Sequence, residues 1–531
     1  MTTAARGQHD NAWRFVVLFA LLLFCWSHQH ALQLSGFSDD LGLLAELPQR
    51  AVRGTLVADV FAKWIGPLWP GSTMWRPLPY ASFALDAIVW SYAPGLWRIT
   101  NLLLHLGVAT LTGLITARLT EQRLAAAAAF ATVLLVPWAP EVTLWLVGRF
   151  DGWATFAIAV SLWAALKSGA ADRWLVLSLV AAVVAYSSKE SALVLPMWIV
   201  LVGMLQTALV KAQQQSAVFV NAFTTVRMRG LLIGGHVVVA VAYLLWRSAL
   251  FSAQAISVYA GTPEHRVSLL SDRILLHLAF PASLAELAPT AAAIVAFAAV
   301  GSLFVPLTLG RCNRLLAFVG GVMALSVVVA VAVFFANPAG SGDGFRLYYL
   351  ATIGLALIAA ATVKTSNKRS LMMLSVFMIA LAVWQSRVAA EWARASRTID
   401  GASQAISLAA AHVARNDFGL VLLPDLMGHV PVARNAQGAL LALKDGTSPA
   451  RDFFIIFTPP QLAEWHQLAL EDVVGKLTQR ADAPAKVTRY YCFDSSKQSL
   501  EQLGYWSPGT LLEWKARWRE AVSARCPDLA F

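Results

Sequence analysis

Long apolar runs recur along this chain and constrain its fold more than any other feature. A helix needs about 20 apolar residues to cross the hydrocarbon core of a bilayer, and about 11 runs qualify. They lie near residues 13–34, 96–118, 124–139, 148–167, 173–187, 190–210, 230–250, 289–309, 314–336, 346–363 and 370–388. Only 13% of the residues are charged, against about 25% in soluble domains. The sequence therefore predicts a polytopic α-helical membrane protein surrounded by lipid.

The basic residues orient these predicted spans. The chain has a net charge of +11, but its Lys and Arg residues form short patches between apolar runs, which argues against nucleic acid as a partner. Such patches stay on the cytoplasmic side of a membrane. The opposite face then receives the segments near 35–95, 137–151, 187–191, 252–288 and 337–346. The first run has no small-residue cleavage site before SGFSDD, so we expect a retained signal anchor.

The last part of the chain changes in character. Charged and polar residues return after about residue 390, and strand-like runs such as FGLVLL and DFFIIF alternate with helical patterns such as PQLAEWHQLALEDVVGKL. We therefore predict a small soluble α/β domain over residues 391–531. An odd number of spans places it outside the cytoplasm, where a disulfide is permitted. Of the four cysteines, only Cys492 and Cys526 could form a disulfide, and the sequence leaves open whether they are bonded.

The stretch SGFSDD carries two adjacent carboxylates, Asp39 and Asp40, directly after the first apolar run. A carboxylate is expensive in lipid and cheap in water. We therefore expect both side chains to lie in water on the outer face. By itself this position is compatible with chance.

A second polar group lies near the outer end of the second predicted span. Asn101 and His105 are four residues apart, so they share one face of a helix. Polar residues on such a face commonly hydrogen-bond to neighbouring helices in membrane proteins. For these two residues alone, that explanation is simpler than a functional one.

The turn APEVTLWLVGRFD is predicted on the outer face but contains Arg149, although basic residues usually stay on the cytoplasmic side. If it is helical, Glu141 and Arg149 recur on one face with Trp145 between them, and Asp151 follows. A Glu and an Arg this close can form an ion pair that satisfies only themselves. The alternative is a functional role for charges kept at the membrane edge.

Further charges occur at Lys189, Glu190 and Arg346, each near the outer end of a predicted span. A lysine at a membrane edge can extend its amine to water without any function. Acidic and basic groups from several outer elements nevertheless suit transfer of a group from a lipid-linked phosphate. Cations would hold the phosphate leaving group while a carboxylate deprotonates the incoming hydroxyl. A guanidinium is well shaped for phosphate because it can bind two oxygens.

The order of these motifs resembles a known superfamily. The acidic pair is followed by RPL, NLLLH, EVTLWLVGRFD, SKESALVLP and FRLYYL. In this order they are similar to the GT-C membrane glycosyltransferases, especially the protein O-mannosyltransferase-like branch, whose animal members carry tetratricopeptide tails, and its bacterial relatives. The likeness covers about residues 13–390. It implies a GT-C-like transmembrane domain over residues 1–390.

The resemblance also implies an activity and roles for residues. The expected enzyme is an inverting hexosyl- or pentosyltransferase of the bacterial inner membrane, with its active site facing the periplasm. Its donor is a polyprenyl-phosphate sugar, and its acceptor is an envelope glycan, a lipid such as lipopolysaccharide, or a protein. The matched positions are Asp39 or Asp40 as general base, with Asp39 slightly favoured, Glu141, Arg149, Asp151, Asn101 and His105 for the acceptor and for orientation, and Lys189, Arg346 and Arg76 for the donor phosphate.

Two departures from the family weaken parts of this assignment. The tail has no 34-residue period and hence no tetratricopeptide array, which puts a protein acceptor in doubt. Arg98 stands where the family often has histidine. No cofactor is expected and no metal-ligand cluster is evident, although a carboxylate pair can recruit a divalent cation through water.

Two other functions compete with this interpretation. A transporter or flippase for a lipid-linked or amphipathic anion also needs cations at membrane depth. Such proteins tend to have internal repeats and broken helices near the bilayer midplane, and no repeat is evident here. An O-antigen ligase or polymerase would share the lipid donor but usually gathers its basic residues in one large outer loop.

Overall fold

The structure is a computed structural model with two compact units. It describes residues 11–69, 72–168, 172–212, 226–251, 311–334, 345–363, 368–412, 417–427, 430–433, 454–457, 487–505, 511–527 and 529. The first unit is assembled from Met1–Ala31, Val57–Ser82 and Arg98–Ala389. The second is assembled from Leu32–Leu56, Phe83–Trp97 and Ala390–Phe531. Both units are therefore built from segments far apart in the sequence.

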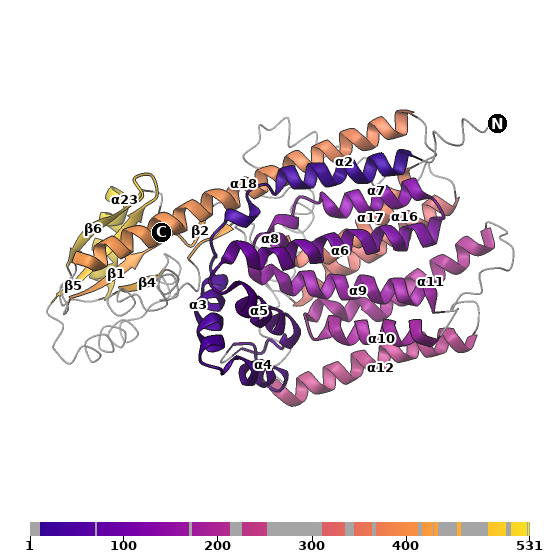
Figure 1. The fold of residues 1–531 in the computed structure, drawn as a ribbon, viewed down its shortest axis with the longest axis horizontal. Coiled ribbons are helices and arrows are strands. Elements are labelled where there is room, and N and C mark those ends of the chain that lie inside the picture. The colour runs from indigo at the N-terminus through magenta and orange to yellow at the C-terminus, as the bar shows by residue number, and fades with distance from the viewer. Residues whose placement is uncertain are drawn as a thin grey trace. The chain divides into compact units, whose positions relative to one another are not determined.

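Helices dominate the described chain, and the long ones of the first unit lie side by side (Figure 1). In chain order the α-helices are α2 (Ala12–Ser27), α3 (Asp39–Val52), α4 (Leu56–Trp64), α5 (Pro77–Trp90), α6 (Pro94–Thr120), α7 (Arg123–Leu134), α8 (Ala139–Thr143), α9 (Arg149–Lys167), α10 (Asp172–Tyr186), α11 (Leu195–Ala212), α12 (Val226–Phe251), α16 (Arg311–Phe334), α17 (Thr352–Thr362), α18 (Lys368–His412) and α23 (Leu511–Arg525). Short 3-10 turns are η1 (Ala31–Gln33), η2 (Leu146–Gly148), η3 (Glu190–Val194) and η7 (Phe345–Ala351).

Five helical segments of the described chain are long and apolar enough to cross a membrane. They are Ala12–Gln33, Pro94–Thr120, Glu190–Leu209, Met228–Phe251 and Leu371–Ala409. Four shorter apolar helices accompany them, at Arg123–Leu134, Arg173–Tyr186, Asn313–Val327 and Arg346–Thr362. The predicted span at 289–309 lies outside the described residues, so the count of about 11 stays a prediction.

Small residues allow the helices of the first unit to approach closely. The alanine-rich α7 packs between α2 and α17, and its side chains from Ala127 to Leu134 are all buried. Gly320 of α16 and Gly354 of α17 face each other so closely that a side chain on either would collide with the backbone of the other. Since lipid gives no hydrophobic drive for helix association, such close packing is what holds helices together in a bilayer.

The helix that contains the last predicted span is longer than the sequence suggested. We expected this span to end near residue 388, but α18 continues for 45 residues to His412. Its continuation, AAEWARASRTIDGASQAISLAAAH, contains no proline and many alanines, so nothing in it stops a helix. The first part of the predicted soluble segment is therefore helical.

The end of the second unit contains a four-stranded sheet in the order β4-β1-β5-β6. Strand β1 (Asp417–Leu422) runs parallel to β4 (Phe454–Phe457) and β5 (Val487–Asp494), whereas β6 (Ser499–Tyr505) is antiparallel to β5. The predicted strands in FGLVLL and DFFIIF are confirmed as β1 and β4. The helix predicted in PQLAEWHQLALEDVVGKL lies outside the described residues, and the boundary at 390/391 remains a prediction.

The core beside this sheet is closed by a disulfide. Cys492 of β5 is bonded to Cys526, directly after α23, with their Cα atoms 6.3 Å apart. Both sulfur-bearing residues are buried with Leu420, Trp518 and Val522. The one cysteine pair that the sequence permitted to bond, Cys492 and Cys526, is therefore bonded.

The disulfide should stabilise this part of the chain measurably. Replacing Cys526 by Ser opens a bond with a sequence separation of 34, and we expect the free energy of unfolding to fall by about 2–4 kcal/mol. Pulse proteolysis in urea of the detergent-solubilised protein would measure the fall. Cys25→Ser is the matched control because Cys25 is exposed and free; equal resistance of the two variants would contradict the prediction.

Candidate functional site

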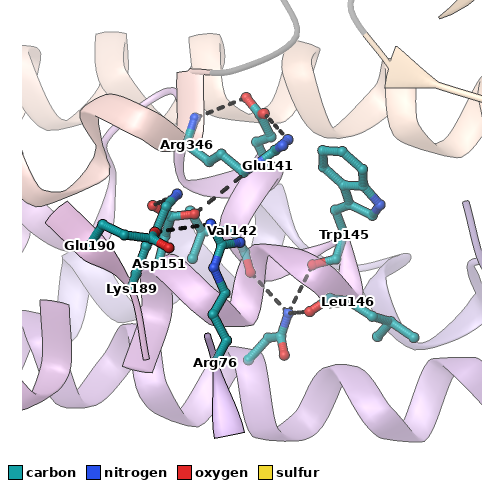
Figure 2. A network of polar contacts seen from close by, with 10 residues as sticks. Arg76, Glu141, Val142, Trp145, Leu146, Asp151, Lys189, Glu190 and Arg346 are labelled. Carbon is teal, nitrogen blue, oxygen red and sulfur yellow. Dashed lines mark hydrogen bonds and ion pairs between the residues drawn. The ribbon is translucent and has the colours of Figure 1, made fainter. Parts of the chain in front are cut away.

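Seven charged side chains form an ion-pair cluster in the first unit. Figure 2 shows all of them except Arg247. Four are cations and three are carboxylates. The members are Arg76, Glu141, Asp151, Lys189, Glu190, Arg247 and Arg346. The predicted charges at these positions are thus brought together from separate parts of the sequence, and Arg247 joins them.

The first pair of the cluster joins α8 to η7. Glu141 Oε1 accepts from Arg346 Nη1 at 2.9 Å, and Glu141 Oε2 accepts from the Arg346 backbone N–H at 3.0 Å. The Arg346 guanidinium also lies over the Trp145 ring, 4.1 Å from its centroid, a cation–π contact. Gly148 permits the tight fold of this segment, because a Cβ there would collide with the Glu141 carbonyl.

Asp151 in the first turn of α9 lies between two cations. Its Oδ1 is 2.5 Å from Lys189 Nζ, and its Oδ2 is 4.0 Å from Arg346 Nε. Lys189 is only 3% exposed, so its amine does not reach to water as a lysine at a membrane edge can. Burial lowers the pKa of Lys189 to about 8, although the Asp151 carboxylate opposes the shift. The Asp151 carboxylate thus favours the charged form of the amine.

Glu190 forms the third part of the cluster. Its Oε2 is 3.1 Å from Arg76 Nη2, and its Oε1 is 2.7 Å from Arg247 Nη1. The other Arg247 nitrogen, Nη2, donates to the Thr73 carbonyl at 3.1 Å. We did not predict Arg247, but one signal marks it: it is a cation near the outer end of a predicted span, like Lys189 and Arg346.

Exposure differs across the cluster. The Arg346, Glu190 and Arg247 side chains are 25%, 20% and 13% exposed, whereas Glu141 and Asp151 are 3% and 5% exposed. Taking charges out of water costs more than their mutual attraction commonly returns. The cluster is thus poorly explained as a device for stability, and its partly exposed cations suit an anionic ligand.

Asn101 and Arg149 serve a different purpose from these ion pairs. Asn101 Nδ2 donates to the carbonyls of Val142 and Trp145, both at 2.9 Å, and its Oδ1 accepts from Arg149 Nε at 2.7 Å. Arg98 Nε donates to the Leu144 carbonyl at 2.6 Å. These side chains satisfy the irregular backbone between α8 and α9, as buried backbone requires.

The structure decides two alternatives that the sequence left open for this turn. The segment from Glu141 to Arg149 is not one helix, because α8 ends at Thr143 and η2 separates it from α9. Glu141 and Arg149 also do not form a pair that satisfies only themselves, because Glu141 pairs with Arg346 and Arg149 bonds to Asn101. Arg346 is 205 residues away from Glu141, beyond the reach of any local pattern.

His105 links α6 to η7. Its Nε2 is 3.1 Å from the Leu134 carbonyl at the end of α7, and its Nδ1 is 2.5 Å from the Tyr349 hydroxyl. Since a carbonyl only accepts, Nε2 carries the proton and Nδ1 accepts from Tyr349. Gln385 Nε2 donates to the same Leu134 carbonyl at 3.0 Å. His105 thus holds the turn that contains Arg346.

Asp39 and Asp40 belong to the second unit and begin α3. Asp39 is partly exposed, but Asp40 is fully buried and its Oδ2 accepts from the Phe37 N–H at 3.3 Å. The expectation that both carboxylates lie in water is therefore wrong for Asp40. A carboxylate at a helix N-terminus faces unpaired backbone N–H groups and the positive end of the helix dipole, which makes its burial tolerable.

The residue before this pair has an unusual backbone. Ser38 has φ 47° and ψ −117°, outside the small left-handed region open to L-residues. Such a conformation costs about 1–3 kcal/mol and is found mostly at functional sites. Among the described residues, no group of three or more His, Cys, Asp or Glu side chains could hold a metal ion.

Comparisons with known proteins identify no family. No family model and no curated protein matches the chain. Among solved structures, the archaeal oligosaccharyltransferase AglB from Archaeoglobus fulgidus, in complex with an inhibitory peptide and a dolichol-phosphate, is 12% identical with a TM-score of 0.45, covering 92% of this chain and 70% of that one. The A. fulgidus oligosaccharyltransferase in the apo form is 10% identical with a TM-score of 0.43, covering 91% and 69%. Similarity at this level assigns neither a family nor an activity.

The contacts of Asn101 predict a large stability effect. Asn101→Ala leaves buried Arg149 without this acceptor and two backbone carbonyls without these donors, so we expect the free energy of unfolding to fall by about 2–3 kcal/mol. The melting temperature in detergent measures the loss. Thr110→Ala on the same helix is the control, because Thr110 is exposed and bonds only to Leu106 of its own helix. Indistinguishable melting temperatures would remove the structural role of Asn101.

Proposed function

We propose that the chain is a membrane glycosyltransferase. It transfers a sugar from a polyprenyl-phosphate donor to an envelope acceptor, namely a glycan, a lipid or a protein, on the periplasmic face of the inner membrane. The order of its motifs supports the GT-C superfamily and, within it, the O-mannosyltransferase-like branch. The single observation that carries the proposal is the buried ion-pair cluster with its partly exposed cations.

The cations of the cluster are the proposed donor-phosphate ligands. Arg346 is the most exposed of them and its guanidinium can bind two phosphate oxygens. Arg76 and Arg247 already hold the two oxygens of a carboxylate, Glu190, which is the bonding that a phosphate would also accept. Lys189, which is more deeply buried than these arginines, adds a further positive charge. Glu141 and Asp151 hold Arg346 and Lys189 in place.

The proposed reaction is a single displacement. The acceptor hydroxyl oxygen bonds to the anomeric carbon of the sugar while the bond from that carbon to the phosphate oxygen breaks. The electron pair of the broken bond leaves with the phosphate, whose charge the cations stabilise. The hydroxyl proton passes to a carboxylate acting as general base. A single displacement inverts the configuration at the anomeric carbon.

Asp39 is the proposed base, and Asp40 is assigned a different role. A base must reach the proton that it removes, and Asp39 is partly exposed whereas Asp40 is fully buried. The Asp40 carboxylate accepts from the Phe37 N–H instead. This contact makes Asp40 a positioning residue for the start of α3.

A transfer assay tests the proposal and the assignment of Asp39. Membrane vesicles would receive radiolabelled polyprenyl-phosphate hexose or pentose together with total envelope acceptor. We expect Asp39→Asn to lower transfer by about 100-fold or more, the size of a general-base contribution, at an unchanged melting temperature. Asp40→Asn, which keeps an oxygen acceptor for Phe37, should retain measurable transfer.

Other outcomes of this assay would contradict the proposal. Full transfer by Asp39→Asn would remove that residue as the base. Label that crosses the bilayer without being transferred, in wild type and variant alike, would instead support an anion transporter or flippase. Mobility of the labelled product would identify the class of acceptor.

Arg346 offers a separate test of the phosphate site. Arg346→Lys keeps the charge but loses the two-pronged bonding, so we expect the KM for the donor to rise while the KM for the acceptor is unchanged. A rise of about tenfold would correspond to one lost charge-assisted hydrogen bond. Lys63→Arg, outside the cluster, is the control for changing one cation into another. Equal rises for donor and acceptor would exclude a phosphate role for Arg346.

A further inference from the structure

The acidic stretch Ser35–Asp40 is held by residues from the end of the second unit. The Ser35 N–H donates to Ser396 Oγ at 2.9 Å, and Ser35 Oγ donates to Asp400 Oδ1 at 2.5 Å. Two residues further on, the buried Phe37 ring meets the buried Trp392 ring edge to face, with centroids 5.0 Å apart. Three side chains on successive turns of α18 therefore contact this stretch.

A second contact comes from the chain after β3 (Val430–Pro431). The Ser38 N–H donates to the Val432 carbonyl at 2.9 Å, and Ser38 is 1% exposed. Val432 is itself fixed, since its N–H donates to the Asp425 carbonyl at 2.8 Å. A non-glycine residue keeps a sparsely populated backbone conformation only where its surroundings enforce it. The hydrogen bond to the Val432 carbonyl holds Ser38 in this backbone conformation.

The conformation of Ser38 decides how the two carboxylates face. The Asp40 N–H donates back to the Phe37 carbonyl at 2.8 Å, and Asp40 Oδ2 accepts from the Phe37 N–H. This reciprocal pair turns Asp40 inward and leaves Asp39 partly exposed. A relaxed backbone at Ser38 would break the pair and redirect Asp39.

We infer that Trp392, Ser396 and Asp400 are positioning residues that, with the Val432 carbonyl, hold Ser35–Asp40 in the shape that presents Asp39. The inference rests on the proposed function, in which Asp39 is the base. In this inference the C-terminal part of the chain contributes to the transfer step because it sets the geometry of Ser35–Asp40. This contribution is separate from any role in recognising the acceptor.

A double-mutant cycle at Ser35 and Asp400 tests this inference in the full-length protein. Ser35→Ala and Asp400→Asn each weaken the same hydrogen bond, so we expect each to lower kcat by about tenfold through misplacement of the base, with an unchanged KM for the donor. The double variant should lose no more than either single one. Hydrogen exchange measured on the peptide that covers residues 35–44 should show faster exchange in all three variants.

The chain offers a closely matched control in the same unit. Ser496 Oγ donates to Asp494 Oδ1 at 2.6 Å in the turn between β5 and β6, a bond of the same type as that of Ser35 and Asp400. Ser496→Ala should leave both kcat and exchange over residues 35–44 unchanged. Equal losses in kcat from this control would mean that the Ser35 variants act only through stability, and would overturn the inference.

The two proposals fail in different ways. Two results would overturn the positioning role even if the wild type transfers sugar well. In the first, the kcat of the double variant falls by the product of the two single losses. In the second, hydrogen exchange over residues 35–44 is the same in every variant as in the wild type. If the wild type transfers no sugar, the proposed function fails. In that case faster exchange in the three variants would still establish the contact, whereas unchanged exchange would remove it.

Discussion

Burial of the Asp151 carboxylate is the constraint on which the charged cluster depends. An unpaired carboxylate away from water is very costly, and Asp151 is compensated by Lys189 on one oxygen and by Arg346 at a longer distance on the other. Those two cations come from the turn before η3 and from η7. The position of Asp151 therefore fixes where two further segments must lie, and through Arg346 it also fixes Glu141.

Buried polar groups of the backbone around the cluster must also be compensated. Between α8 and α9 the chain is irregular, and in lipid such backbone is tolerated only where protein groups satisfy it. Asn101 and Arg98, from one face of α6, supply these donors. At the end of α7, His105 and Gln385 do the same for the Leu134 carbonyl. The polar residues of α6 thus act mainly as internal ligands for the backbone.

Much of this organisation could be predicted from local patterns. Apolar length identified several helices, among them α6 and α9, close to their observed bounds. Spacing placed Asn101 and His105 on one face because a helix repeats every 3.6 residues. Lys189 and Arg346 could be recognised as unusual because they are basic residues on the predicted outer face of the membrane. Short apolar runs identified β1 and β4 because each is rich in branched or aromatic side chains.

Pairing could not be predicted in the same way. Glu141 has a basic neighbour eight residues away, Arg149, and nothing in the local sequence indicates that its carboxylate bonds to Arg346, 205 residues away. The burial of Asp40 beside the partly exposed Asp39 depends on the backbone of Ser38, which in turn depends on Val432, almost 400 residues later in the chain. Long-range contacts of this kind are set by tertiary packing, which a single sequence does not encode in any short window.

The contact between Gly320 and Gly354 has a consequence beyond packing. Two backbones that touch without intervening side chains have no rotamers to adjust, so α16 and α17 respond to any added volume by moving as whole helices. Helix α17 continues directly from η7, which carries Arg346. A single methyl group added at Gly354 would thereby shift the guanidinium of Arg346, although Gly354 itself carries no charge.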